Sequence, residues 1–567
     1  MKRSLLLLPT LGLLAASVHA DGPSFNRDIK PILSDKCFMC HGPDEKARKG
    51  KLRLDLERDA RAAVGTSTEN SKVLARITAT GDDHMPPAAS GKHLSEAEIA
   101  KLRTWIESGA KYEQHWAFVP PQRPAMPAVQ NAAWPRNDID RFILAKLESQ
   151  HIAPSPEADP ATLLRRVYLD LVGLPPTPEA VAQFLADPSQ EAYVQVVDQL
   201  LPSPHFGERW GRHWLDAAHY ADSNGYSVDA PRSIWPYRDW VINAINRDLP
   251  FDQFVTEQLA GDLLPDATIE QKTATGFLRN TMINEEGGID KEEFRQEAVL
   301  DRVNTIGTTL LGLTLGCAKC HSHKYDPIEQ HEYYRLMAFL NNDDEPTLEI
   351  STPDYEAQKS AFEKKLKDLN DAQQAYLDGA TENRKAWEAD LKLPFLQTLD
   401  EEDRGALATP WDKRTPEQAG FALSVFRKND LEAVARDEAI KKLEKERPKT
   451  PTTMVVAARK EPRETHLRVQ GDYTRPSDVV PPGTPAALNA SPPNASTRLD
   501  LAHWLMARDN PLTARVTVNR FWLRLFGRGI VETEDDFGMQ GTPPSHPELL
   551  DWLAVEFMDQ GWSQKTL

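Results

Sequence analysis

The sequence contains the stretch Cys37-Phe38-Met39-Cys40-His41 and, much later, the stretch Cys317-Ala318-Lys319-Cys320-His321. These two stretches, the first and second motifs, use all four cysteines of the 567-residue chain. Four cysteines could instead form two disulfides. The repeated spacing, with a histidine directly after each cysteine pair, predicts one shared chemistry for the two motifs.

The pattern Cys-x-x-Cys-His is typical of c-type haem attachment, in which both thiols form thioethers and the histidine binds the iron. A zinc site would need the two cysteine pairs close enough to share one ion, and they lie far apart in the sequence. A thioredoxin-like dithiol would need a strand, a turn and a helix around it, and neither motif has that pattern. We therefore predict two covalently attached c-type haems, bound by Cys37, Cys40 and His41 and by Cys317, Cys320 and His321.

Residues 25–41 have the pattern of a helix that leads into the first motif, because Ile29, Ile32 and Leu33 recur at helical spacing. A second helix is predicted after Ser95, which forms a capping box with Glu98. Ile99, Leu102 and Ile106 give this helix an apolar face, and Gly109 ends it. A haem helix, a loop and a closing helix within residues 21–113 predict a small cytochrome c-like module.

The loop between these helices, 81–87, holds one methionine between His84 and two prolines. We predict that the thioether of Met85 is the sixth ligand of the first iron, opposite His41. Met/His ligation raises the reduction potential and suits electron transfer. His84 is the main alternative ligand.

The first 20 residues have a basic start, a short apolar run and a small residue, Ala20, at the expected cut, which together predict a secretory signal peptide. No other long apolar stretch follows, and the mean hydropathy is −0.53. We therefore expect an exported chain, periplasmic or extracellular, without a membrane span in its mature part. The net charge of −18 argues against a nucleic-acid partner and suits a basic redox partner protein.

The second motif leaves the sixth iron ligand open. His323 follows His321 too closely to reach the opposite face of one porphyrin, so we expect it to bind a haem propionate or shape the pocket. The candidates for the opposite face are His213, His219, Met282, His331 and Met337. The pattern also permits an iron with no sixth ligand, which could bind a substrate.

Many polar residues surround the second motif, and they allow three interpretations. They could form a proton-handling pocket, or the run 284–290 could bind a cation through oxygen ligands. The more common role is structural, with arginine–carboxylate pairs holding helices together. These residues are Asp222, Asn224, Asn284, Glu285, Glu286, Arg295, Asp301, Arg302 and Asn304.

The remaining pattern predicts a mainly α-helical, multidomain protein. We expect a linker over 114–136, a second haem-bearing helical domain over 137–345 and a helical or coiled-coil arm over 346–450. A small β element with a linker follows over 451–496. The pattern of the last region, 497–567, is that of an incomplete helical domain.

Several of these stretches resemble one family. Residues 25–41 with 50–55 resemble the planctomycete-type cytochrome c domain. Residues 165–178, 209–226 and 284–328 resemble an uncharacterised domain that follows it in large secreted proteins, and residues 510–551 resemble the start of the C-terminal secreted domain of that family. The resemblance implies haem binding and electron transfer, but no defined reaction. Members continue beyond this point, so the resemblance also implies a fragment.

We expect an exported dihaem cytochrome that transfers electrons. One alternative is a haem oxidoreductase whose second iron is the active centre. The other is an extracellular scaffold in which haem has only a structural role.

Overall fold

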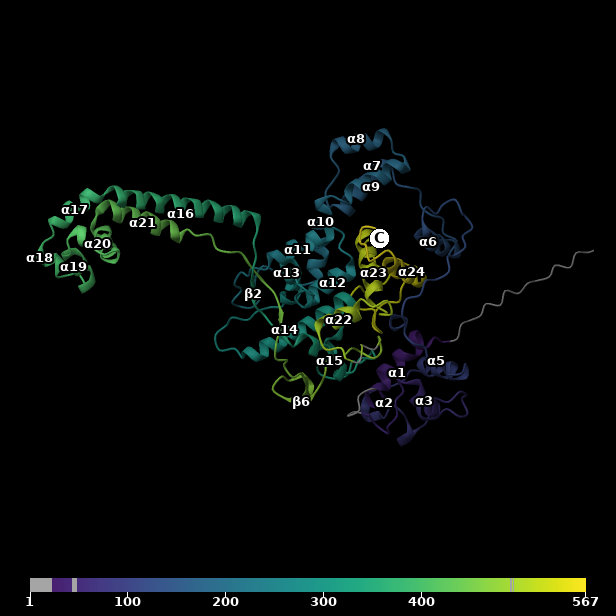
Figure 1. Ribbon diagram of the computed structural model, residues 1–567. Coiled ribbons are helices and arrows are strands. Elements are labelled where there is room, and N and C mark those ends of the chain that lie inside the picture. Colours follow the sequence, from purple (N-terminus) through teal and green to yellow (C-terminus); the bar gives the residue numbers. More distant parts are fainter. Residues whose placement is uncertain (1–22, 43–47, 490–491, 493) are drawn as a thin grey trace, which may run out of the picture. The chain divides into compact units, whose positions relative to one another are not determined.

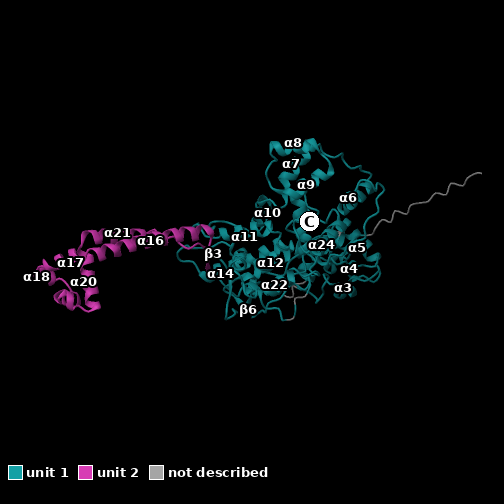
Figure 2. Ribbon diagram, turned by 45° about the horizontal axis from the view of Figure 1, so that its top comes forward, with its two compact units in different colours: residues 1–346, 454–567 teal, residues 347–453 magenta. Residues whose placement is uncertain are grey.

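The computed structural model describes residues 23–42, 48–489, 492 and 494–567. Over these residues the protein is mainly α-helical, as the sequence predicted, and the six short strands form three two-stranded sheets. The predicted signal peptide, 1–20, lies outside the described residues. The chain forms two compact units, one of residues up to 346 together with 454–567 and one of residues 347–453 (Figure 2).

The N-terminal module has a hydrophobic core of its own. Ile29, Ile32 and Leu33 are buried in it, as their spacing predicted, together with Leu102 and Ile106 of the closing helix. That closing helix, α5, begins with the predicted capping box of Ser95 and Glu98. The helices of the module are α1 (Lys30–Lys36), α2 (Phe38–His41), α3 (Glu57–Val64), α4 (Lys72–Ile77) and α5 (Glu96–Glu107).

The segment 114–136 was predicted to be a surface linker, but part of it is buried. Ala117 and Phe118 lie in the core of the larger helical region. The guanidinium of Arg515 donates hydrogen bonds to the carbonyls of Trp116 and Val119, at 3.2 and 2.6 Å. This contact ties the segment to the C-terminal helices.

The larger helical region joins two stretches that the sequence pattern separated. Residues 137–345 and 497–567 contribute to one continuous hydrophobic core. The C-terminal helices α23 and α24 pack against each other within this unit (Figure 1). The helices are α6 (Asp138–Ser149), α7 (Pro160–Leu171), α8 (Pro178–Ala186), α9 (Gln190–Leu200), α10 (Pro204–Ala217), α11 (Trp235–Asn246), α12 (Phe251–Ala260), α13 (Ile269–Ala274), α14 (Lys291–Ile306), α15 (Gln330–Leu340), α22 (Arg498–Leu505), α23 (Thr513–Phe526) and α24 (Pro547–Asp559).

A buried ion-pair cluster lies where these two stretches meet. Arg498, at the start of α22, is 2% exposed and donates to Asp262 at 2.8 and 2.9 Å and to Asp343 at 2.7 Å. It also donates to the carbonyl of Leu259 at the end of α12. The guanidinium therefore connects three segments that are distant in sequence.

The predicted β element over 451–482 is present, but its strands belong to different sheets. β4 (Ala457–Ala458) pairs antiparallel with β1 (Asp343–Asp344). β5 (His466–Arg468) pairs antiparallel with β6 (Pro476–Val479), with an irregular register. β3 (Thr452–Met454) pairs with β2 (Thr347–Glu349).

The unit of residues 347–453 is helical, in agreement with the predicted arm. α16 (Pro353–Gly379) packs along α21 (Leu431–Lys445), and the shorter helices follow the far end of α16 (Figure 2). Leu377, Ala380, Phe426 and Ala433 form its small core. The shorter helices are α17 (Thr381–Ala389), α18 (Leu393–Leu396), α19 (Glu401–Ala408) and α20 (Pro416–Asn429). Among the described residues, none of the helices combines the length and apolar character needed to span a bilayer.

Replacing Arg498 with methionine should destabilise the larger helical region strongly. The variant keeps the apolar part of the side chain but leaves Asp262 and Asp343 buried without their cation, a loss that typically costs about 3–5 kcal/mol. Urea unfolding followed by circular dichroism measures the change. Arg528→Met, which removes an exposed pair with Glu532, is the control and should leave the midpoint unchanged. Equal midpoints for the two variants would contradict the role of Arg498.

Candidate haem sites

The first motif forms a single helical turn. The backbone N–H groups of Cys40 and His41 both donate to the carbonyl of Cys37, at 3.1 and 2.8 Å. Leu54 N–H donates to the carbonyl of His41, which fastens the end of the turn to the following segment. Both thiols and the imidazole are thus presented by one short element, as haem attachment requires.

The two cysteines and the histidine of the first motif are half-buried, and their chemistry fits a haem. Both cysteines are free thiols, and burial raises the pKa of Cys37 to about 12. Burial also lowers the pKa of His41, against a weaker effect from the backbone of Lys49, which favours the neutral imidazole that binds iron. Nδ1 of His41 is buried and has no hydrogen-bond partner among the described residues. These residues fit covalent haem, with His41 as the ligand.

The loop that carries Met85 is fixed by backbone contacts. Met85 N–H donates to the carbonyl of Arg76 at 3.0 Å, and the side chain is half-buried. The neighbouring ring of His84 hydrogen-bonds through Nδ1 to the carbonyl of Ala79, at 2.9 Å. This bond leaves Nε2 of His84 for an iron, so Met85 stays the predicted ligand and His84 stays its alternative.

The second motif begins on a short 3-10 turn, η8 (Leu315–Lys319), and Cys320 and His321 follow directly after it. Leu315 and Ala318 are buried, whereas Cys317, Cys320 and His321 are exposed. Both cysteines are free thiols. The two motifs therefore differ in solvent access, because the first is half-buried and the second is open.

The carbonyl of Lys319 holds the second turn in place. It accepts hydrogen bonds from Gln330 Nε2 at 2.9 Å and from Tyr334 Oη at 3.1 Å, both on α15. The ammonium of Lys319 pairs with Glu297 on α14 at 2.7 Å. Helices on two sides thus fix a turn whose reactive side chains face solvent.

His321 has a hydrogen bond that is common among metal-binding histidines. Its Nδ1–H donates to the carbonyl of Ser322 at 2.7 Å, so the proton lies on Nδ1 and the lone pair lies on Nε2. Metal-binding histidines are typically oriented by such a bond from their second nitrogen. His321 thus presents Nε2 to an iron, and the second motif also fits a haem.

Gly471 lies against Cys320, although no pattern in the sequence links its segment to the motif. Its φ is +77°, and a Cβ at this position would lie 2.8 Å from Sγ of Cys320. Only glycine satisfies both the backbone conformation and the close approach. The contact comes from the β5–β6 connection, about 150 residues later, so no local pattern could have revealed it.

His323 has a structural role beside the second motif. It is 2% exposed, and its Nδ1 accepts the N–H of Asp326 at 2.9 Å. The carboxylate of Asp326 accepts the N–H of Met539 at 2.8 Å, and a Cβ on Gly538 would lie 2.4 Å from it. Of the two roles expected for His323, this network supports pocket shaping.

Three of the six charged residues predicted around the second motif, Asp222, Arg295 and Arg302, are used in structural contacts. Arg295 pairs with Glu292 at 2.7 Å, and Arg302 pairs with Glu345. Tyr220 donates to Asp222 at 2.6 Å. In the part of the chain that the structure describes, no group of three or more His, Cys, Asp or Glu side chains is placed to hold a metal ion, so the run 284–290 gains no support as a cation site.

One polar cavity has in its wall Asn304, a residue close to the start of the second motif. It has a volume of about 300 Å³ and is lined in part by Asp216, His219, Asn304 and Arg520. The amide of Asn304 would lie 3.6 Å from a Cβ on Gly316, directly before Cys317. Asn304 also accepts a hydrogen bond from Tyr333 at 3.1 Å, which fixes its amide.

The structure places the candidate sixth ligands in different surroundings. His219, with a φ of +58°, lines the cavity beside Asn304. His331 is exposed on the first turn of α15, and Met337 is buried in the core. Met282 is 55% exposed and contacts Gly225, and His213 lies in a separate aromatic cavity. Two of these candidates lie close to groups that contact the second motif: His219 shares a cavity with Asn304, and His331 follows Gln330, which donates to the carbonyl of Lys319.

Comparison with protein families gives three matches, in the order found along the chain. Residues 37–89 match the family described as Planctomycete cytochrome C. Residues 138–345 match a protein family of unknown function (DUF1549), and residues 497–567 match another (DUF1553). No curated protein and no solved structure is detectably similar to the chain.

The fold of the N-terminal module, its Cys-x-x-Cys-His turn and the first match define a c-type haem protein. The three matches together give the chain the planctomycete-type multidomain cytochrome architecture, as the resemblance predicted. The second motif falls inside the second match, whose family has no assigned function.

Replacing Met85 with alanine should remove the sixth ligand of the first iron. We expect the absorption band that arises from sulfur–iron ligation, near the red end of the spectrum, to disappear while covalent haem remains. His84→Ala is the matched control and should keep the band. An unchanged band in Met85→Ala would show that another residue is the ligand.

Replacing Gly471 with alanine should impair thioether formation at Cys320, because the new Cβ would displace its sulfur. Mass spectrometry of the peptide that contains the second motif measures the fraction of chains with haem attached there. Gly527→Ala is the control, because Gly527 has the same φ of +77° but no atom near its Cβ position. Both substitutions carry the backbone cost of about 1 kcal/mol. Equal attachment in the two variants would contradict the proposed contact.

Proposed function

We propose that this protein is an exported dihaem c-type cytochrome that transfers electrons between partner proteins. The observation that carries the proposal is the use of all four cysteines in two motifs of one design. In both motifs the thiols lie on a single turn followed directly by a histidine. The hydrogen bond from Nδ1 of His321 supports the second haem in particular, since it leaves Nε2 for the iron.

Contacts between the segments that carry the two motifs support electron transfer within the chain. Ser34, one turn before Cys37 on α1, is buried and donates to the carbonyl of Lys324 at 3.4 Å. Burial lowers the pKa of Lys30 on the same helix, and the charge of Asp326 opposes this effect. Lys324 and Asp326 both follow the second motif closely. Haems held at the two motifs would therefore be carried by segments in direct contact.

The charge of the chain supports a basic redox partner. The net charge of −18 would attract a positively charged protein at low ionic strength. The predicted signal peptide supports a location outside the cytoplasm, where c-type haem is used. Periplasmic and extracellular locations fit equally.

A haem oxidoreductase is the second candidate function, and the cavity beside the second motif favours it. The exposed motif and the cavity lined by His219 and Asn304 leave room for a small molecule. Burial raises the pKa of Asp301, which lies one turn before Asn304, while the charges of His219 and Arg302 act against this shift. Such a carboxyl can hold or release a proton near the site.

An absorption spectrum with haem quantitation tests these functions on protein exported through a c-type maturation system. Two haems per chain, with a reduced spectrum unchanged by carbon monoxide, are expected for an electron carrier. A shift of one haem would favour the oxidoreductase. Fewer than two haems would contradict the dihaem assignment, and two haems without reversible reduction would favour the structural scaffold.

Paired cysteine variants assign the haems to their motifs. Cys37→Ala with Cys40→Ala should leave one haem, and Cys317→Ala with Cys320→Ala should leave the other. We expect the second pair to abolish any carbon monoxide shift, because the open cavity lies beside that motif. A shift that survives in this variant would place the open iron at the first motif.

A further inference from the structure

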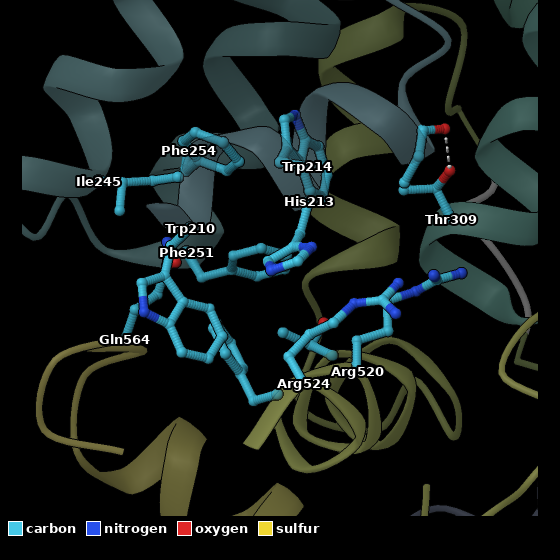
Figure 3. A pocket seen from close by; sticks show the side chains of 13 residues that line it. Trp210, His213, Trp214, Ile245, Phe251, Phe254, Thr309, Arg520, Arg524 and Gln564 are labelled. Carbon is cyan, nitrogen blue, oxygen red and sulfur yellow. Dashed lines mark hydrogen bonds between the residues drawn. The ribbon is translucent and has the colours of Figure 1, made fainter. Parts of the chain in front are cut away.

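Unpaired polar groups in the wall of a cavity indicate a bound molecule only where the cavity brings them together. The aromatic cavity that contains His213 does not do this. Figure 3 shows Trp210 and Gln564 on one side of it and Arg520 on the other, although each has an unpaired nitrogen. A smaller cavity, called the inner cavity below, has a volume of about 10 Å³. Its polar lining residues are His219, Asn280, Thr281, Asp301, Arg302 and Thr305.

Two residues in the wall of the inner cavity have buried side-chain atoms without a hydrogen-bond partner among the described residues. Asn280 is 5% exposed, and both Nδ2 and Oδ1 of its amide are unpaired. Arg302 is 3% exposed and pairs with Glu345 through a terminal nitrogen, but its Nε is unpaired. Buried polar groups without partners are costly, and each of them calls for an explanation. The wall of one small cavity thus offers both unpaired N–H donors and an unpaired acceptor.

The size and the chemistry of the inner cavity fit a water molecule. A cavity needs about 10–15 Å³ of free space to hold one water, and buried waters typically make about three hydrogen bonds to otherwise unpaired groups. Because the inner cavity is no larger than this, a molecule inside it contacts all of its walls. Water both donates and accepts, as the amide of Asn280 and the Nε–H of Arg302 together require.

The inner cavity lies between a carboxyl group and the polar cavity of about 300 Å³ that Asn304 lines. Asp301 lies in its wall, and burial raises the pKa of this carboxyl. His219 and Thr305 line both cavities, and Nδ1 of His219 lies 3.5 Å from the hydroxyl of Thr305. The imidazole of His219 therefore forms part of the wall between the two spaces.

We propose that the inner cavity holds one ordered water molecule, bound by Asn280 and Arg302, that connects the carboxyl of Asp301 with the imidazole of His219. Asp301 can then give its proton to the water while the water gives one of its own to His219. The water stays neutral, and one proton moves to the wall of the polar cavity. The use of this proton rests on the second candidate function, the haem oxidoreductase, whereas the water site does not.

A crystal structure of the full chain that resolves ordered water tests the proposal directly. We expect one water in the inner cavity, about 2.7–3.2 Å from polar atoms of Asn280, Arg302, Asp301 and His219. An empty cavity would overturn the site. A water that contacts Asn280 and Arg302 but neither Asp301 nor His219 would overturn the proton connection. Both outcomes are independent of haem content and redox activity, so they are distinct from a failure of the proposed function.

Two substitutions test the water in solution. Asn280→Leu removes the amide that binds the water. Thr453→Val is the matched control, because Oγ1 of Thr453 is also buried and unpaired within the described part of the chain but lies outside the inner cavity. Magnetic relaxation dispersion of water oxygen-17 counts long-lived internal waters, and Asn280→Leu should lose one while Thr453→Val loses none. Equal counts in Asn280→Leu and the unsubstituted protein would overturn the site.

The melting temperatures of the same variants separate a hydrated amide from a dry one. Loss of a hydrogen-bonded group destabilises a protein, whereas loss of an unpaired buried group is neutral or stabilising. The melting temperature should therefore fall in Asn280→Leu and stay the same or rise in Thr453→Val. A rise in both variants would mean that Asn280 has no water partner and would overturn the proposal.

Discussion

The larger helical region depends on one buried guanidinium. Arg498 pairs with the carboxylates of Asp262 and Asp343 and donates to a helix-terminal carbonyl, and these groups come from two segments more than 80 residues apart in sequence. A charge this deeply buried is tolerated only when it is paired and hydrogen-bonded. The cluster explains why residues 137–345 and 497–567 form one core. The region that carries the second motif therefore shares a hydrophobic core with the C-terminal helices.

The two motifs show how one sequence pattern can be placed in different environments. The first lies inside a small module with its own core, where burial raises the pKa of Cys37 and lowers the pKa of His41. The second lies on an exposed turn that is hydrogen-bonded to α15 and ion-paired with α14. Solvent exposure, hydrogen bonding and burial are among the factors that set the potential of a protein-bound haem. Two centres with unequal potentials would follow from this difference.

Local sequence features were reliable where local interactions decide the structure. The capping box at Ser95 and the buried positions of α1 were predicted because helix periodicity and capping act within a few residues. Gly471, Gln330 and Tyr334 could not be predicted as neighbours of the second motif, since only tertiary folding brings them there. The burial of Phe118 in a segment that looked like a surface linker has the same cause. The strands near residue 455 were predicted, but their partners were not, because pairing depends on distant residues.

The first and last residues of the helical arm lie next to each other in space. Ile350 N–H donates to the carbonyl of Pro451 at 2.9 Å, and β2 pairs with β3 beside this bond. The two ends of the insertion are thus held together by hydrogen bonds. About 100 residues between these strands have a core of their own. Because closing a longer loop adds little entropic cost, a position like this can accept insertions of different lengths. Evolution or an engineer could resize it while the larger helical region keeps its architecture.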